Sequence, residues 1–144
     1  MRCAGRFGIR ESPFAIDAIV VLPDHLHAIW TLPEREPGYA LRWRLIKATF
    51  SRALRRGEKV SLSRSRKRER GVWQRRYWEH MIRDEDDFAR HADYIHFNPV
   101  KHGHVRRVVD WPYSSFHHLD WSGRYPAEWA GASDDSHNSG FGER

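Results

Sequence analysis

Two histidines stand one residue apart in the stretch VVLPDHLHAIW, residues 20–30. Side chains alternate between the two faces of a β-strand, so on a strand His25 and His27 would present their imidazoles to the same side. Imidazole is a common metal ligand, but a chain with ten histidines contains about one His-x-His triplet by chance. A second triplet does occur, at His102 and His104. The triplet alone therefore predicts no site.

Further ligands are available in the segment Asp84–Asn98, for which the sequence predicts a helix. Tyr94 and Asn98 are four residues apart and would share a helical face. If that face packs on the histidine strand, an amide oxygen and a phenol lie beside the imidazoles. Two histidines and a third ligand leave open positions for a substrate oxygen, and the residue types do not decide between zinc and other divalent metals.

A tyrosine beside such a metal has a specific use. Phenol is a poor nucleophile at neutral pH, but a nearby cation favours the phenolate and polarises a phosphoryl group. Attack of Tyr94 on a DNA phosphodiester would give a phosphotyrosine and a free 3′-hydroxyl. Reversal onto another 3′-hydroxyl would rejoin strands without ATP.

The elements that would position these residues can be predicted from hydrophobic patterning. Two apolar stretches, residues 14–22 and 25–32, flank Pro23-Asp24 and predict a β-hairpin. An amphipathic helix is predicted from Tyr39 to Gly57, a flexible basic loop over residues 61–71, and a third strand over residues 76–82. The later helix begins at the acidic cluster of residues 84–87 and is expected to end before Pro99.

At 144 residues the chain fits one domain. We expect a disordered lead-in over residues 1–13, the domain over residues 14–120, and a flexible tail over residues 121–144. A single cysteine excludes an internal disulfide, and the sequence contains neither a signal peptide nor a long apolar span. These features predict a cytoplasmic protein.

The basic charge is concentrated in one region. The net charge is +6, but residues 35–76 contain fifteen Lys and Arg against three Asp and Glu. Such a cationic segment is typical of polyanion binding, although a merely solvated helix face would look the same. The residues we expect to contact DNA are Arg42, Arg44, Lys47, Arg75, Arg76 and Lys101.

Longer motifs indicate a family. LPDHLHAIW resembles the HUH motif of single-tyrosine transposases, and HADYIHFNPVKHGHV resembles the tyrosine motif of REP-associated tyrosine transposases. The stretches VWQRRYWEHMIRDEDDF and DWPYSSFHH are similar to the same branch, so the resemblance covers residues 14–118. The joint spacing of the two motifs is far more specific than either motif alone.

The resemblance implies that His25 and His27 bind a divalent metal, Mg²⁺ or Mn²⁺, with Asn98 as third ligand and Tyr94 as the nucleophile that takes the 5′-phosphate. It implies an α+β fold, a ferredoxin-like antiparallel sheet backed by helices. The implied substrate is single-stranded DNA with REP hairpins, and the implied assembly is a monomer or homodimer. Because the family has a strand and a helix upstream of the hairpin, we expect a truncated chain whose sheet has an unfilled position.

Alternative interpretations stay open at this stage. The chain could be a catalytically inactive, truncated remnant that only binds DNA, or a His-x-His metallohydrolase acting on small phosphoesters. Tyr94 could serve only as a packing residue, and Asn98 could cap the C-terminus of its helix before Pro99.

Overall fold

The computed structural model describes residues 5–7, 14–34, 38–55, 57, 59–67, 69–74, 77–120 and 129. The chain divides into two compact units, one formed by Met1–Pro33 with Met81–Arg144 and the other by Glu34–His80. None of the helices in this described part combines the length and the apolar composition that a membrane crossing requires.

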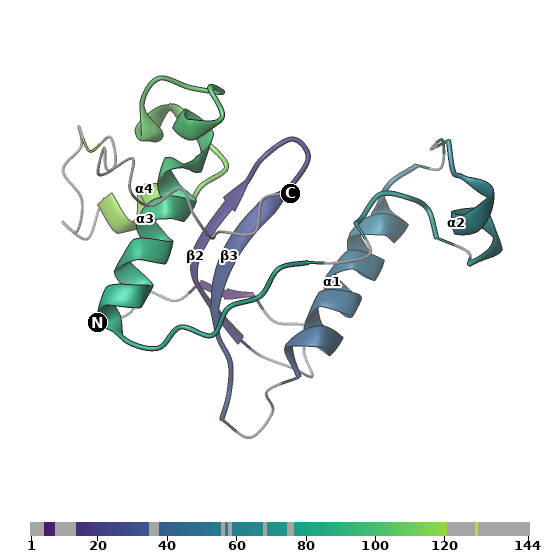
Figure 1. The fold of residues 1–144 in the computed structure, drawn as a ribbon, viewed down its shortest axis with the longest axis horizontal. Helices are drawn as coiled ribbons and strands as arrows, with labels where there is room; N and C mark the ends of the chain where they lie inside the picture. Colours follow the sequence, from purple (N-terminus) through teal and green to yellow (C-terminus); the bar gives the residue numbers. More distant parts are fainter. Residues whose placement is uncertain are drawn as a thin grey trace. The chain divides into compact units, whose positions relative to one another are not determined.

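An antiparallel sheet of order β1-β2-β3 lies in the first unit, with strands β1 (Gly5–Phe7), β2 (Phe14–Val21) and β3 (Leu26–Thr31) (Figure 1). The predicted hairpin is confirmed as β2 and β3. The expectation of a disordered lead-in is wrong for Gly5–Phe7, which pair with the start of β2 through the backbone. A three-residue strand is too short to show an alternating pattern, so hydrophobic patterning does not reveal it.

The edge of β2 opposite β3 is also paired near its other end. The Val21 amide donates to the Tyr113 carbonyl at 2.9 Å, and the Ser115 amide donates to the Ile19 carbonyl at 2.8 Å. The Ile19 amide in turn donates to the Ser115 hydroxyl at 2.8 Å. Backbone from residues 113–115 therefore pairs with this part of the β2 edge.

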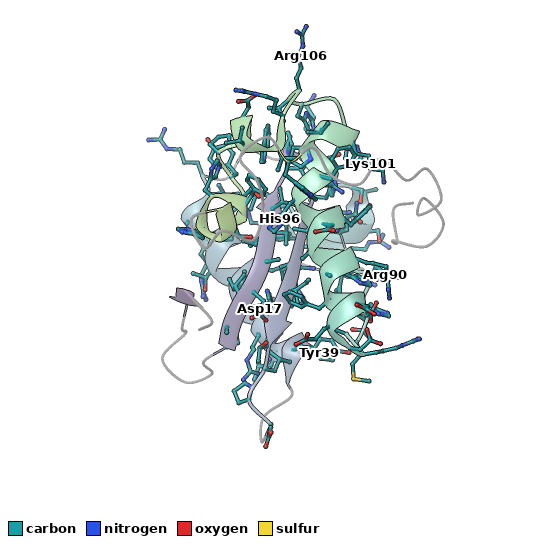
Figure 2. The ribbon with its side chains drawn as sticks, turned by 90° about the vertical axis from the view of Figure 1, so that its left-hand side faces the viewer. Asp17, Tyr39, Arg90, His96, Lys101 and Arg106 are labelled. Carbon is teal, nitrogen blue, oxygen red and sulfur yellow. The ribbon has the colours of Figure 1, made fainter. Side chains whose placement is uncertain are left out.

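Helix α3 (Glu85–Lys101) packs on the hairpin and closes the core of this unit. Figures 1 and 2 show the helix alongside the two long strands. Its buried Ala92 and Ile95 belong to the same apolar cluster as Ala18 and Val20 of β2 and Ile29 of β3. The helix face with Ala92 and Ile95 therefore packs on the hairpin face with Ala18, Val20 and Ile29.

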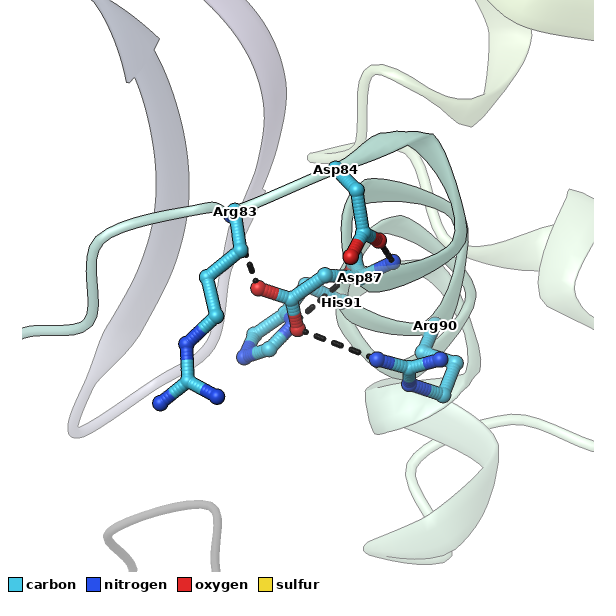
Figure 3. A network of polar contacts seen from close by, with 5 residues as sticks. All are labelled: Arg83, Asp84, Asp87, Arg90 and His91. Atoms are coloured by element: carbon cyan, nitrogen blue, oxygen red, sulfur yellow. Dashed lines mark hydrogen bonds and ion pairs between the residues drawn. The ribbon is translucent and has the colours of Figure 1, made fainter.

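The N-terminus of α3 is capped as the acidic cluster predicts. The carboxylate of Asp84 accepts a hydrogen bond from the Asp87 amide at 2.7 Å. The buried Asp87 carboxylate accepts one from the Arg83 amide at 3.0 Å and pairs with Arg90 and His91 (Figure 3). The bond to Asp84 satisfies a backbone donor that the first turn leaves without a helical partner.

The C-terminus of α3 differs from expectation, because Pro99 lies inside the helix and Lys101 is its last residue. The end is set instead by Gly103, whose φ is +70°. The Gly103 amide donates to Val100 and the His104 amide to Pro99, each at 2.9 Å, which is the Schellman arrangement. His102, and not Asn98, is the C-cap residue.

The chain after α3 packs back onto the unit, as its apolar pattern predicts. It forms the 3₁₀ turn η1 (Val108–Asp110) and the short helix α4 (Phe116–Asp120). Val108 and Phe116 are fully buried, and Trp129 stacks on Phe116. Apart from Trp129, the predicted tail of residues 121–144 lies outside the described residues.

The second unit contains helix α1 (Tyr39–Ala53), as predicted, and a short helix α2 (Leu62–Arg66) within the segment we expected to be a loop. Ser61 starts α2 by accepting a hydrogen bond from the Arg64 amide. The third strand predicted over residues 76–82 is wrong, because Tyr77–Ile82 have no regular structure. The Tyr77 ring packs against Tyr39 and Trp43 of α1 and not on a sheet.

Replacement of Gly103 tests the turn that ends α3. Gly103→Ala is expected to lower the free energy of unfolding by about 1 kcal/mol, because an L-residue is strained at positive φ. Urea denaturation followed by circular dichroism measures the loss. Gly57→Ala is the matched control: an added Cβ meets no atom within 4 Å at either position, and the φ of Gly57 is not positive. Equal effects of the two substitutions would contradict the assignment of strain to Gly103.

Candidate metal and tyrosine site

The two histidines of the first triplet lie together at the tip of the hairpin. His25 closes the turn, its carbonyl accepting a hydrogen bond from the Leu22 amide at 2.9 Å, and His27 is in β3. We expected both on the strand; His25 immediately precedes it. The two ring centroids are 5.1 Å apart, with the rings nearly perpendicular.

Asp24 orients the first of these rings. Its carboxylate lies 2.7 Å from Nδ1 of His25, and this hydrogen bond holds the pKa of the Asp24 carboxyl below its usual value. With the carboxylate as acceptor, Nδ1 is the donor, and in a neutral imidazole with this tautomer Nε2 has a lone pair. Nε2 of His25 is buried and has no hydrogen-bond partner among the described residues.

Tyr94 of α3 meets the histidines across the helix–strand contact. Its ring centroid is 5.5 Å from that of His27, in an edge-to-face arrangement. Asn98 follows one turn later and is completely buried. It lies three residues after Ile95 and therefore on the helix face that packs on the hairpin. The predicted packing of the Tyr94 face on the histidine strand is thus what the structure shows.

Two residues from the C-terminal end of α3, Lys101 and the C-cap His102, complete the surroundings. The Lys101 ammonium donates a hydrogen bond to the Tyr94 hydroxyl at 3.2 Å. The His102 ring centroid is 5.2 Å from that of His25. Sequence reasoning assigned Lys101 to DNA, treated the second triplet as chance, and saw Asp24 only as a turn residue. A carboxylate directly before His-x-His was the available signal for Asp24.

The basic residues expected to contact DNA are in different situations. Arg44 is exposed, whereas Arg42 is only 2% exposed, so its guanidinium is not available on the surface and we withdraw it as a DNA contact. The Lys47 ammonium lies 5.2–5.7 Å from the ring centres of Tyr77, Trp43 and Trp73, and burial lowers its pKa. Arg75 and Arg76 lie outside the described residues.

Comparison with curated proteins gives two strong matches, although no family model matches the chain. A Haemophilus influenzae protein named "Putative REP-associated tyrosine transposase" is 49% identical over 123 residues, which are 85% of this chain and 70% of that protein. The REP-associated tyrosine transposase of Escherichia coli K12 is 48% identical over 122 residues, 85% of this chain and 66% of its own length.

A solved structure also matches. It is described as the REP-associated tyrosine transposase bound to a REP hairpin, and it shares 45% identity and a TM-score of 0.71 with this chain. The match covers 88% of this chain and 68% of that one, so the chain spans about two thirds of the length of its relatives. The α+β antiparallel fold expected from the sequence is confirmed. On these similarities in sequence and structure, the chain belongs to the family of REP-associated tyrosine transposases.

Proposed function

We propose that this protein is a single-stranded DNA endonuclease and strand transferase that acts on REP hairpin DNA through a 5′-phosphotyrosine intermediate and requires a divalent metal. The observation that carries the proposal is the meeting of His25, His27 and Tyr94, which come from two elements far apart in the sequence. The family and the hairpin bound in the solved relative support the choice of substrate.

The residues present fit a metal ion. Two imidazoles bound to one ion have ring centres about 5 Å apart, given metal–nitrogen bonds near 2 Å. The His25 and His27 rings are 5.1 Å apart, and the buried Nε2 of His25 is free to act as a ligand. A carboxylate on the other ring nitrogen is the usual partner of a metal-binding histidine. His25, His27 and Asn98 would hold Mg²⁺ or Mn²⁺, which would supply Lewis-acid polarisation of the phosphoryl group.

Tyr94 would carry the chemistry. Its hydroxyl oxygen attacks the phosphorus of a phosphodiester, the bond to the 3′-oxygen breaks, and the DNA downstream is left on Tyr94 through its 5′-phosphate. The tyrosine loses its proton to solvent and the departing 3′-oxygen gains one, so the step balances. Attack by another 3′-hydroxyl on the phosphotyrosine reverses the exchange and joins two strands.

Removal of the Tyr94 hydroxyl tests the intermediate. The wild-type protein should form a covalent adduct with a 3′-labelled REP hairpin oligonucleotide in Mg²⁺ or Mn²⁺, seen as a shifted band in a denaturing gel. Tyr94→Phe should form none. Tyr113→Phe, at a tyrosine that is 65% exposed, is the control and should keep the adduct. An adduct that survives Tyr94→Phe refutes the proposal, and hairpin binding without any adduct favours the inactive DNA-binding alternative.

Removal of the Asp24 carboxylate tests the metal centre separately. Asp24→Ala should weaken Mn²⁺ binding about 10- to 100-fold, because His25 loses the partner that fixes its orientation. Isothermal titration calorimetry without DNA measures the affinity. Asp17→Ala is the matched control, since Asp17 lies on the same hairpin but accepts its hydrogen bond from Thr31. Equal affinities of the two variants would show that Asp24 does not support the ligand.

The basic surface of α1 gives a third test. Arg44→Gln should weaken binding of the hairpin and reduce the slope of log affinity against log salt by about 0.7–1, the effect of one lost phosphate contact. Fluorescence anisotropy over a series of salt concentrations measures both. Arg44→Lys preserves the charge and should preserve the slope. An unchanged slope in Arg44→Gln would remove Arg44 from the DNA surface.

A further inference from the structure

We propose that Lys101 is a positioning residue for the Tyr94 nucleophile, a role that differs from the phosphate contact expected from its charge. The effect of Lys101 on the reaction rests on the proposed function, because it requires that Tyr94 reacts with DNA. The contact between Lys101 and Tyr94 is present in the protein without DNA. Lys101 Nζ donates to the Tyr94 hydroxyl at 3.2 Å and lies 4.8 Å from the centre of the same ring. One ammonium thus lies close to both the ring and the oxygen of the phenol.

The backbone places Lys101 where this contact can form. It lies seven residues after Tyr94, two helical turns along the same face of α3. Immediately after it, the turn at His102 and Gly103 is tied to Asn98 and Val100 by backbone hydrogen bonds of 3.0 and 2.9 Å. Figure 2 shows Lys101 near the C-terminal end of α3. The helix therefore ends at the residue that reaches back to the tyrosine, and its last turn is well fixed.

The Tyr94 ring has one neighbour from the strand and one from its own helix. His27 contacts the ring edge-to-face from the strand, and Lys101 contacts it from the helix. A tyrosine side chain has two rotatable bonds, and a hydroxyl held before DNA binds spends less binding energy on orientation. The ammonium also lies where negative charge gathers on the tyrosine oxygen as its bond to phosphorus breaks during rejoining. Position and charge therefore both give Lys101 a role in the reaction step.

Single-turnover kinetics separate this role from a phosphate contact. Lys101→Met keeps most of the side-chain length and removes the charge and the donor. We expect the rate of adduct formation at saturating hairpin oligonucleotide to fall about 10- to 100-fold, as for loss of a charged hydrogen bond. The dissociation constant should stay within about twofold of wild type on this hypothesis. Lys101→Arg should restore most of the rate, because it keeps a cationic donor.

The control is Arg106→Met, since Arg106 is an exposed cation of the same unit that extends away from the structure in Figure 2. It should leave the saturated rate unchanged. A saturated rate of Lys101→Met within twofold of wild type overturns the inference, whatever its dissociation constant. A loss that Lys101→Arg does not restore also overturns it, because the effect would then come from packing.

A measurement without DNA keeps this test distinct from the test of the proposed function. The contact predicts nuclear Overhauser effects between the ε-methylene protons of Lys101 and the ring protons of Tyr94 in the free protein. These signals should be present in the wild type and in Tyr113→Phe. Their absence refutes the positioning role even if adducts form, whereas a wild type that shows them without forming adducts refutes only the proposed function.

Discussion

The burial of one face of α3 against one face of the β2–β3 hairpin determines the rest of the site. Ala92 and Ile95 share an apolar cluster with Ile29, and His27 precedes Ile29 by two residues on the same strand face. Tyr94 and Asn98 flank Ile95 on the helix. Since strand and helix periods are fixed, packing Ile29 and Ile95 in one cluster brings the His27 imidazole and the Tyr94 phenol close together. The hydrophobic effect of burying these apolar side chains therefore stabilises the arrangement of the polar residues beside them.

Much of this arrangement could be predicted because it depends on periodicity. The hairpin, α1, the capped start of α3 and the shared face of Tyr94 and Asn98 all follow from residue spacing. The predictions were wrong where the local structure depends on which segments pair or on tertiary contacts. Backbone bonding places β1 on β2 and gives no sequence signal. The segment expected to form a strand over residues 76–82 is rich in aromatic and apolar residues, but Tyr77 packs on a helix. Pro99 is tolerated inside α3 because the Schellman turn, and not the proline, ends the helix.

Within the site, residue types and faces were predictable, whereas directions of side chains were not. His25, His27 and Tyr94 were expected together and lie together. The contacts of Asp24, Lys101 and His102 depend on rotamers and on the turn at Gly103, which no spacing rule specifies. Arg42 illustrates the opposite error, since a position on a basic helix predicted exposure and the structure buries it. The pattern of charges shows how many cationic residues a segment contains. It does not show which of their side chains are exposed to solvent.

The pairing of β2 with residues 113–115 also bears on how the protein is made. The hydrogen bond between Ile19 and Ser115 joins positions 96 residues apart, and the compact unit Glu34–His80 lies between them in the sequence. A ribosome completes the histidine hairpin long before it supplies the segment that covers this edge. During synthesis the Ile19–Val21 part of this edge therefore lacks its partner, and contacts of such long range form slowly. The strand that leads to His25 and His27 is therefore open, at this stage of synthesis, to pairing with other strands.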